Sequence, residues 1–204
     1  MNPDKQLVII GAGGHGRVAQ DIARYTYSKI VFLDDADVKH ENIVLVGRTK
    51  DYIKYIGNSD FFIAIGNNSV REKVSGMLKS FGANIVSLIH PNAVISNSVN
   101  IGVGSVVMAG AVINANANIG DGCIVNTCSS VDHDCNIYDF CHISVGTHLA
   151  GTVQVGARTF IGAGATVINN TSICADCIIG AGAVVVKDIE KNGTYIGVPA
   201  KEKI

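Results

Sequence analysis

Residues 101–137 read IGVGSVVMAGAVINANANIGDGCIVNTCSSVDHDCNI, and an isoleucine or valine recurs in them at every sixth position. The same register continues in both directions, from Ile89 to Val185. A period of six matches neither the turn of an α-helix nor the alternation of an ordinary strand, so it describes a larger repeating unit. The aliphatic positions are Ile89, Ile95, Ile101, Val107, Ile113, Ile119, Val125, Val131, Ile137, Ile143, Leu149, Val155, Ile161, Val167, Ile173, Ile179 and Val185.

A second position in each hexad is small or short almost throughout, and it lies four residues after the aliphatic one, as at Ala111, Cys123 and Thr147. One large and one small inward residue per hexad suit a narrow prism of short parallel strands, with glycine or asparagine at many corners. Each coil of such a prism buries its core only by stacking on the next coil. The hexads therefore predict a parallel β-solenoid.

All six cysteines lie in the hexad region, and four of them occupy the small inward position. Those four are Cys123, Cys135, Cys141 and Cys177. Buried thiols behave as small hydrophobic groups. Cys174 and Cys177 have CxxC spacing, but the repeat already accounts for them, so we predict no metal site and no redox role.

The composition is close to electrically neutral, with 16 basic and 17 acidic residues and a formal net charge of −1. No run of either sign predicts a nucleic-acid groove or a membrane-binding face. No apolar stretch is long enough to span a bilayer, and the start, MNPDKQ, lacks the pattern of a signal peptide. We expect a cytoplasmic protein with no nucleic-acid or membrane partner.

The residues before the hexads alternate between apolar runs and helical patterns, which predicts a parallel α/β sheet covered on both faces. Strands are expected at 7–10, 29–33, 44–47, 61–68 and 84–89, and helices at 17–25 and 69–81. This region ends near His90 and Pro91, so it holds about one mononucleotide-binding half of the full dinucleotide fold. A single nucleotide is therefore a more natural ligand than a dinucleotide.

A glycine fingerprint, Gly11, Gly13 and Gly16, stands between the first predicted strand and the first predicted helix. Glycines let a ligand approach the backbone, and free amides at a helix start favour a phosphate. Asp34 or Asp35, at the end of the next strand, is placed to accept a hydrogen bond from a ribose or base. The alternative is a glycine turn that only packs the helix on the sheet.

The most chemically suggestive segment is 126–148, NTCSSVDHDCNIYDFCHISVGTH, which contains three histidines and three aspartates. His133 falls at a corner or outward position, and His142 precedes the inward Ile143. A histidine with a carboxylate partner is a suitable general base near neutral pH. Asp134 is adjacent, but neighbours on an extended strand point to opposite faces, so pairing needs a bend. The alternative is that these histidines are solvated surface residues.

The last motif, residues 195–201 (YIGVPAK), is a glycine-proline turn beside a cation. It is usable for an anionic phosphate, or it is a plain terminus.

Together, GAGGHG, FLDD, IAIGNN, NTCSSVDHDC and GVPAK resemble the bacterial nucleotide-sugar acetyltransferases of the PglD and NeuD group, over essentially the whole chain. These are hexapeptide-repeat acyltransferases with a left-handed parallel β-helix, in which three hexads form one coil. The resemblance implies an α/β half-Rossmann-like nucleotide-sugar-binding domain at 1–90, a left-handed β-helix acetyltransferase domain at 91–188 and a coenzyme A-proximal tail at 189–204.

The resemblance also implies roles for individual residues. His133 is then the general base and Asp134 raises its basicity. The UDP-sugar is held by Gly13, Gly14, His15, Asp34, Asp35 and Gly66. Acetyl-coenzyme A (acetyl-CoA) is contacted by His142, Gly151, Ala163 and Ala181. The family implies a homotrimer with each site between neighbouring prisms, direct transfer in a ternary complex, and no metal.

Three functions follow from these observations as hypotheses. The first is N-acetylation of a UDP-linked 4-amino-4,6-dideoxy sugar for bacillosamine-type glycans. The second is O-acetylation of a sialic-acid-type sugar, because the same base could deprotonate a hydroxyl. The third is a nucleotide-binding scaffold without catalysis, since a fold alone never determines function.

Overall fold

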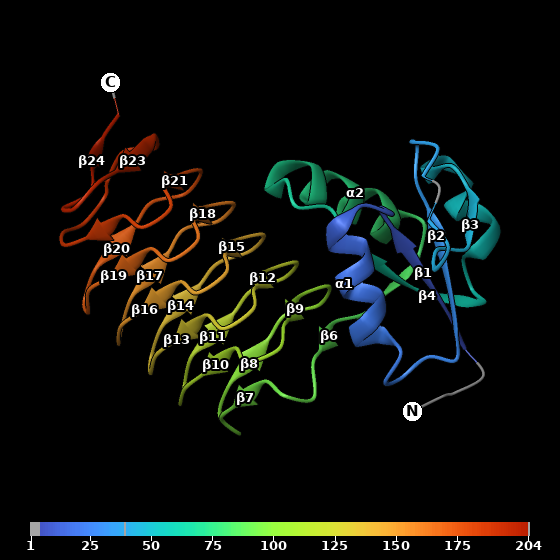
Figure 1. Cartoon of the computed structure of the whole chain (residues 1–204), viewed down its shortest axis with the longest axis horizontal. Coiled ribbons are helices and arrows are strands. Elements are labelled where there is room, and N and C mark those ends of the chain that lie inside the picture. The colour runs from blue at the N-terminus through green and yellow to red at the C-terminus, as the bar shows by residue number, and fades with distance from the viewer. Residues whose placement is uncertain (1–4, 39, 204) are drawn as a thin grey trace. The chain divides into compact units, whose positions relative to one another are not determined.

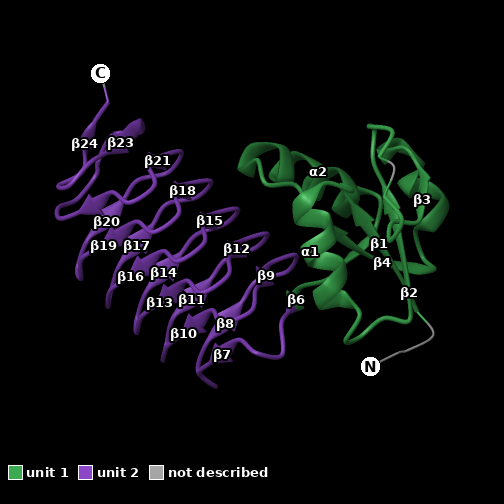
Figure 2. Cartoon of the chain, viewed as in Figure 1, with its two compact units in different colours: residues 1–88 green, residues 89–204 purple. Residues whose placement is uncertain are grey.

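The computed structural model describes residues 5–38 and 40–203. The chain divides into two compact units, residues 1–88 and 89–204 (Figure 2). The domain boundary predicted from the sequence lay after residue 90. Residues 1–4 of the predicted first domain and residue 204 of the predicted tail lie outside the described residues.

The first unit is an α/β domain with a five-stranded parallel sheet in the order β3-β2-β1-β4-β5 (Figure 1). Its strands are β1 (Gln6–Ile10), β2 (Lys29–Leu33), β3 (Leu45–Gly47), β4 (Ser59–Ile63) and β5 (Asn84–Ile85). Its helices are α1 (Gly14–Ala23), α2 (Asn68–Ser80) and a 3₁₀ helix, η1 (Thr49–Tyr55). The strand order reverses between β1 and β4, which makes the ends of these strands the topological switch point where ligands bind in such sheets.

The apolar runs predicted as strands form the centre of this sheet, and Phe32, Phe61 and Phe62 are at most 1% exposed. Two details differ from the prediction. The second helix was predicted to end at Phe81, but α2 ends at Ser80, and Phe81 is its C-cap and is 55% exposed. Its ring packs edge-on against Tyr52 of η1, a helix that was not predicted, with ring centroids 5.7 Å apart.

The second unit consists of short parallel strands stacked coil on coil, each sheet taking every third strand in turn (Figure 1). One sheet contains β7 (Val94–Ile95), β10 (Val112–Ile113), β13 (Ser130–Val131), β16 (His148–Leu149), β19 (Thr166–Val167) and β22 (Val184–Val185). The second contains β8 (Asn100–Ile101), β11 (Asn118–Ile119), β14 (Asn136–Ile137), β17 (Gln154–Val155) and β20 (Ser172–Ile173). The third contains β6 (Leu88–Ile89), β9 (Val106–Val107), β12 (Ile124–Val125), β15 (His142–Ile143), β18 (Phe160–Ile161), β21 (Ile178–Ile179), β23 (Thr194–Ile196) and β24 (Lys201–Glu202).

Paired residues in neighbouring coils are one coil of three hexads apart, as in the pairing of Val112 with Ser130 and of Ile113 with Val131. The unit is thus the left-handed parallel β-helix that the hexads and the resemblance predicted. The aliphatic hexad positions from Val107 to Val185 are all at most 2% exposed. One large and one small side chain per hexad fill the prism, so the core is a single continuous cluster.

The first three aliphatic positions of the hexads are less buried than those that follow. Ile89 is 47% exposed, and Ile95 and Ile101 only pack against the edge of the core cluster. They belong to the end strands of the three sheets, which have a neighbouring coil on one side only. The period of the sequence shows that the coils repeat, but it does not show which coil is the last in the stack.

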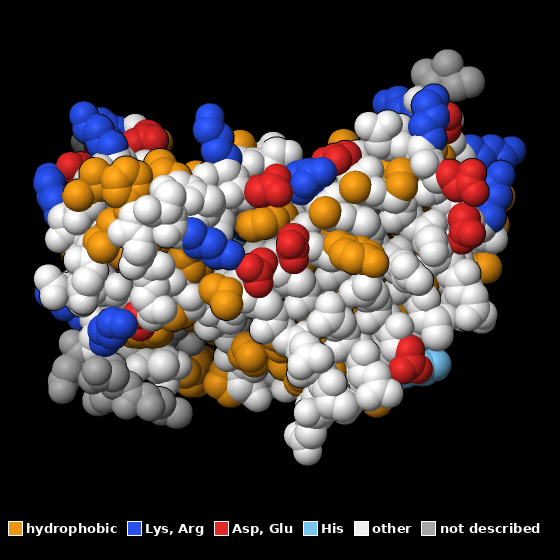
Figure 3. All heavy atoms as spheres, turned by 180° about the vertical axis from the view of Figure 1, so that it is seen from behind, with side chains coloured by type: hydrophobic (Ala, Val, Ile, Leu, Met, Phe, Trp, Pro, Cys, Tyr) orange, Lys and Arg blue, Asp and Glu red, His pale blue; other side chains and the backbone are white. Residues whose placement is uncertain are grey.

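The prediction that four cysteines occupy buried inward positions is confirmed, because Cys123, Cys135, Cys141 and Cys177 are at most 1% exposed. The Sγ atoms of Cys174 and Cys177 lie 3.4 Å apart. Within residues 5–38 and 40–203, no helix combines the length and apolar character needed to cross a bilayer. In the same residues no group of three or more His, Cys, Asp or Glu side chains is arranged to hold a metal ion. Figure 3 shows acidic and basic side chains interspersed on the face it presents.

Candidate active site

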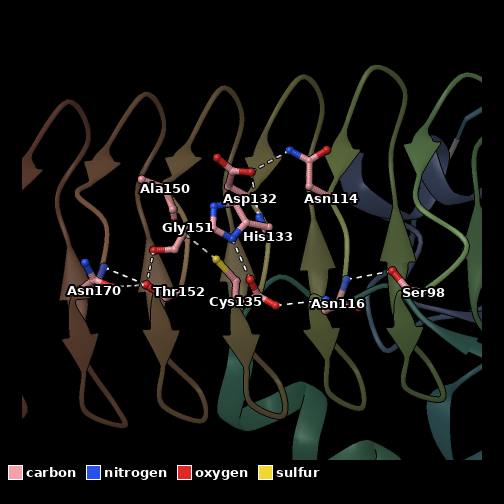
Figure 4. Close-up of polar contacts among 11 residues, drawn as sticks. Ser98, Asn114, Asn116, Asp132, His133, Cys135, Ala150, Gly151, Thr152 and Asn170 are labelled. Atoms are coloured by element: carbon pink, nitrogen blue, oxygen red, sulfur yellow. Dashed lines mark hydrogen bonds and ion pairs between the residues drawn. The ribbon is translucent and has the colours of Figure 1, made fainter.

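His133 and Asp134 form a hydrogen-bonded pair at a corner of the β-helix, just after β13. His133 Nδ1 donates to Asp134 Oδ2 at 2.8 Å (Figure 4). Asp134 has a φ of 58°, in the left-handed region, so the chain bends there instead of continuing as a strand. Aspartate and asparagine tolerate this conformation better than most residues. The bend resolves how two adjacent residues place their side chains on the same side.

A second carboxylate holds the backbone of the same histidine. Asp132 Oδ1 accepts from His133 N at 2.8 Å and from Asn114 Nδ2, also at 2.8 Å (Figure 4). Asp134 Oδ1 accepts from Asn116 Nδ2 at 3.2 Å. His133 therefore stands between two carboxylates, each of which is anchored by an asparagine from the preceding coil.

This surrounding charge favours the protonated imidazole. The hydrogen bond to Asp134 raises the pKa of His133, and the charges of Asp132 and Asp134 add to the rise, although the His133 side chain is 56% exposed. The pKa of Asp134 is lowered, first by its bond to His133 and then by Asn116. With Nδ1–H donating to Asp134, the neutral ring carries its lone pair on Nε2, the atom a general base uses.

Gly151 lies one coil beyond His133 and borders this lone pair. A Cβ atom built on Gly151 would lie 2.5 Å from His133 Nε2. Any side chain at position 151 would therefore displace the imidazole. The resemblance assigned Gly151 to acetyl-CoA, and the structure adds contact with the candidate base.

The other residues assigned to acetyl-CoA lie elsewhere on the β-helix. His142 in β15 is half-buried, and its Nε2 accepts from Asn126 Nδ2 at 3.1 Å. Its ring stands edge-on to Phe160 with centroids 5.1 Å apart. Ala163 and Ala181 are exposed and one coil apart on another corner. Asn126, the partner of His142, was not predicted, although it lies in the quoted histidine segment.

In the α/β unit, the glycines of the GAGGHG motif lie in two different environments. Gly11 has a φ of 103°, and a Cβ there would lie 2.7 Å from the carbonyl oxygen of Ala64; a Cβ on Gly16 would overlap the carbonyl of Gly11. These two glycines allow α1 to pack closely on the sheet. Gly13 and Gly14 are exposed, and the nearest atom to a Cβ on Gly14 would be 3.9 Å away. Close packing therefore accounts for Gly11 and Gly16 but not for the exposed Gly13 and Gly14.

The two aspartates after β2 are engaged with the backbone. Asp34 Oδ2 accepts from the N–H of Ala12 at 2.6 Å, which ties it to the glycine loop, and Oδ1 accepts from the N–H of Ala36 at 2.8 Å. Asp35 Oδ1 accepts from Thr49 N at 3.0 Å. A carboxylate has about four acceptor positions, so Asp34 keeps capacity for a ligand donor while it holds the loop.

His15, in the first turn of α1, is kept neutral. Burial, followed by the charge of Arg71, lowers the pKa of His15 to about 4. Its ring stands edge-on to Phe62 with centroids 6.4 Å apart. Its Nε2 atom is buried and has no hydrogen-bond partner among the described residues. His15 therefore carries a neutral imidazole whose buried Nε2 has an unsatisfied hydrogen-bonding position.

Arg71 of α2, which was not among the predicted residues, is a buried charge beside the loop that follows β4. It is only 1% exposed, and its Nη1 donates to the carbonyls of Ile65 at 2.9 Å and Gly66 at 3.2 Å. Its Nη2 donates to Asn68 Oδ1 at 2.9 Å. The guanidinium thus fixes the loop after β4, which contains the predicted substrate residue Gly66, at the switch point.

The C-terminal segment continues the β-helix. β23 extends the sheet of β21 in parallel, and β24 returns antiparallel to it. A hollow of about 350 Å³ at this end of the unit is lined by both basic and acidic residues, among them Lys187, Lys191, Lys201, Asp188, Glu190 and Glu202. Lys191 Nζ is 3.2 Å from Glu202 Oε1.

Comparison with known proteins gives matches over both units. Residues 6–78 match the family model of the PglD N-terminal domain, and residues 152–187 match that of the bacterial transferase hexapeptide with six repeats. The acetyltransferase domain of PglB from Neisseria gonorrhoeae FA1090 is 41% identical with a TM-score of 0.94, covering 98% of this chain and 100% of that one. That domain has also been solved in complex with acetyl coenzyme A.

PerB from Caulobacter crescentus, solved in complex with CoA and GDP-perosamine, is 43% identical with a TM-score of 0.90, and 97% of each chain is covered. Variants of the GDP-perosamine N-acetyltransferase of the same organism, with one histidine replaced by alanine or asparagine, also match. The UDP-N-acetylbacillosamine N-acetyltransferase of Bacillus subtilis (strain 168) is 38% identical over 108 residues. That match spans half of this chain and half the length of that curated relative.

Proposed function

The chain belongs to the family of acetyl-CoA-dependent sugar N-acetyltransferases that join a PglD-type α/β domain to a hexapeptide β-helix, and from this premise we propose its reaction. It transfers the acetyl group of acetyl-CoA to the 4-amino group of a UDP-linked 4-amino-4,6-dideoxy sugar, in the synthesis of bacillosamine-type glycans. The observation that carries this proposal is the His133–Asp134 pair, with its 2.8 Å hydrogen bond at an exposed corner.

In the proposed mechanism His133 is the general base. Its neutral Nε2 accepts the proton that the sugar amine loses as the amine nitrogen attacks the thioester carbonyl. Asp134 stabilises the imidazolium that forms and holds the ring in the required tautomer. The proton then passes to the sulfur of the leaving coenzyme A, so the products are an amide and a thiol. Both substrates bind together, and no covalent enzyme intermediate is needed.

The nucleotide sugar is proposed to bind at the switch point of the α/β unit. The exposed Gly13 and Gly14 stand at the start of α1, where free amides and the helix dipole favour phosphate oxygens. The neutral His15, the loop at Gly66, and Asp34 with Asp35 complete the proposed site. The B. subtilis relative, by its name, acts on a UDP-linked amino sugar, which supports the choice of nucleotide.

Acetyl-CoA is proposed to bind along the β-helix through His142, Gly151, Ala163 and Ala181. The small residues among them leave backbone groups accessible. The C-terminal tail, with its lysines around the hollow, is proposed to lie near the phosphates of the coenzyme. The PglB and PerB complexes with acetyl coenzyme A and CoA support this assignment.

We further propose a cytoplasmic homotrimer with each site between neighbouring prisms. A cyclic trimer closes through heterologous interfaces, in which one surface of each subunit packs against a different surface of the next, and a flat prism face suits such packing. Light scattering coupled to gel filtration would measure the mass. A monomer would contradict the shared site.

One experiment tests the reaction. The protein is incubated with acetyl-CoA and, separately, UDP-linked 4-amino sugars, a GDP-linked 4-amino sugar and sialic acids, while free thiol is followed. Turnover with a UDP-linked 4-amino sugar and an amide in the product are expected. Turnover on the sialic acid alone would favour O-acetylation, and no turnover on any acceptor would favour the non-catalytic scaffold.

A further inference from the structure

The two oxygens of the Asp134 carboxylate have separate partners. Oδ2 accepts from His133 Nδ1 at 2.8 Å, and Oδ1 accepts from Asn116 Nδ2 at 3.2 Å. The Asp134 side chain is 48% exposed, so solvent alone would not keep it in one orientation. The amide of Asn116 is a second contact that restrains the carboxylate in the orientation in which one oxygen faces the imidazole.

Asn116 is itself held from the preceding coil. It lies 18 residues before Asp134, at the same corner, with a left-handed φ of 60°. Its N–H donates to Ser98 Oγ at 2.9 Å (Figure 4). The backbone N–H of Asp134 donates to the carbonyl of Ala115 at 2.9 Å, which fixes the spacing between the two corners. Three coils therefore place one amide donor against one carboxylate oxygen.

We propose that Asn116 is a positioning residue for acetyl transfer, acting through Asp134 on the base His133. This role rests on the proposed function. Asn116 serves it in two ways: its amide donates to the ionised carboxylate and stabilises that form, and its bond to Oδ1 prevents rotation that would withdraw Oδ2 from the imidazole. A side chain with no donor at this corner loses both effects.

Asn116→Gly tests this role without straining the corner, because glycine adopts a left-handed φ freely. Asn116→Asp keeps the shape but replaces the donor with a second carboxylate. In both variants we expect kcat to fall about tenfold, the size of one hydrogen bond to a charged group, with KM changed less than about twofold. In Asn116→Gly, which adds no charge, the acid limb of the kcat/KM profile and the His133 pKa measured by NMR are expected to move to lower pH.

Asp176→Gly is the matched control. Asp176 also stands at a left-handed corner, with a φ of 60°, and also has a partner one coil earlier, since Arg158 Nε donates to Asp176 Oδ1 at 2.7 Å. It lies on a different corner from the candidate pair. We expect this variant to keep its rate and His133 pKa, while its unfolding midpoint resembles that of Asn116→Gly.

The outcomes separate this inference from the proposed function. If His133→Ala is inactive but both Asn116 variants keep their rate and His133 pKa, the positioning role is wrong and the base stands. A fall in kcat with an unmoved His133 pKa, or an equal fall in Asp176→Gly, would also overturn the role, because either indicates a general structural effect. If His133→Ala remains active, the proposed base itself fails.

Discussion

The two units use their residues in opposite ways. In the α/β unit each functional position is unique: Gly11 and Gly16 pack one helix on the sheet, and Arg71 fixes one loop. In the β-helix every position is repeated one coil later, and a corner is built the same way each time. In the first unit, the candidate residues come together because the strand order reverses at one place. In the second unit, a candidate site arises where the residue type changes at a position that every coil repeats.

The corner that carries the candidate base illustrates this. Asn116, Asp134, Thr152 and Asn170 occupy equivalent positions, with φ between 58° and 64°. Thr152 and Asn170 bond to each other, Oγ1 to Oδ1, at 2.6 Å. Only Asp134 follows a histidine and points its carboxylate at that histidine. The scaffold supplies the geometry, and two residues convert it into a candidate acid–base pair.

The largest effect is expected from replacing the candidate base, a change that leaves the β-helix intact. His133→Ala should lower kcat by about 10²- to 10⁴-fold, the range that general base catalysis contributes. The side chain is 56% exposed and fills no core space, so the unfolding midpoint should not change. Steady-state kinetics and thermal unfolding measure both. A rate near that of the unmodified protein would remove His133 as the base.

Adding one methyl group at Gly151 tests how closely the neighbouring coil confines the imidazole of His133. Gly151→Ala places a Cβ 2.5 Å from His133 Nε2, so the ring must turn away from Asp134. A displacement of this kind can cost about 100-fold in kcat. Gly76→Ala is the control in the other unit, since nothing lies within 4 Å of its Cβ. Equal rates in both variants would contradict this confinement.

In the α/β unit the expected effect is on stability and substrate binding. Arg71→Met removes the donors to Ile65 and Gly66, and a buried group left unsatisfied costs about 1–3 kcal/mol. Urea unfolding should show this loss. KM for the nucleotide sugar should rise while KM for acetyl-CoA stays the same, and the pKa of His15 should rise because Arg71 lowers it. An unchanged nucleotide-sugar KM would exclude Arg71 from substrate binding.

The smallest expected effect is a shift along the pH axis. A general base must be neutral, and the pKa of His133 is raised, so kcat/KM should rise with pH and level off above a midpoint higher than the ordinary histidine value of about 6.5. Asp134→Asn removes the charge that raises it, and asparagine tolerates the left-handed corner. The midpoint should therefore move to lower pH. A midpoint that stays in place would show that Asp134 does not tune the base.

Much of the β-helix could be predicted because its period is strict: each aliphatic residue from Val107 to Val185 is buried as expected. The pairing of His133 with Asp134 followed from the family resemblance but not from strand geometry, because it depends on one backbone dihedral that the rule for extended strands does not include. An asparagine and an aspartate spaced 18 residues apart, as Asn116 and Asp134 are, would have signalled a left-handed corner. Arg71 resembled a surface charge in the helical sequence NSVREKV, since sequence alone does not show which face α2 buries.

Because residues of neighbouring coils pair 18 residues apart, the length of the β-helix is set by its number of coils. Neighbouring strands are about 4.8 Å apart, so each coil advances the prism by one fixed step. Adding or deleting a whole coil beyond Asn170 would move the C-terminal lysines by one step relative to His133 and turn no side chain outward. Adding a single residue would instead rotate every later hexad out of register. The distance from His133 to the C-terminal end can therefore change only by whole coils.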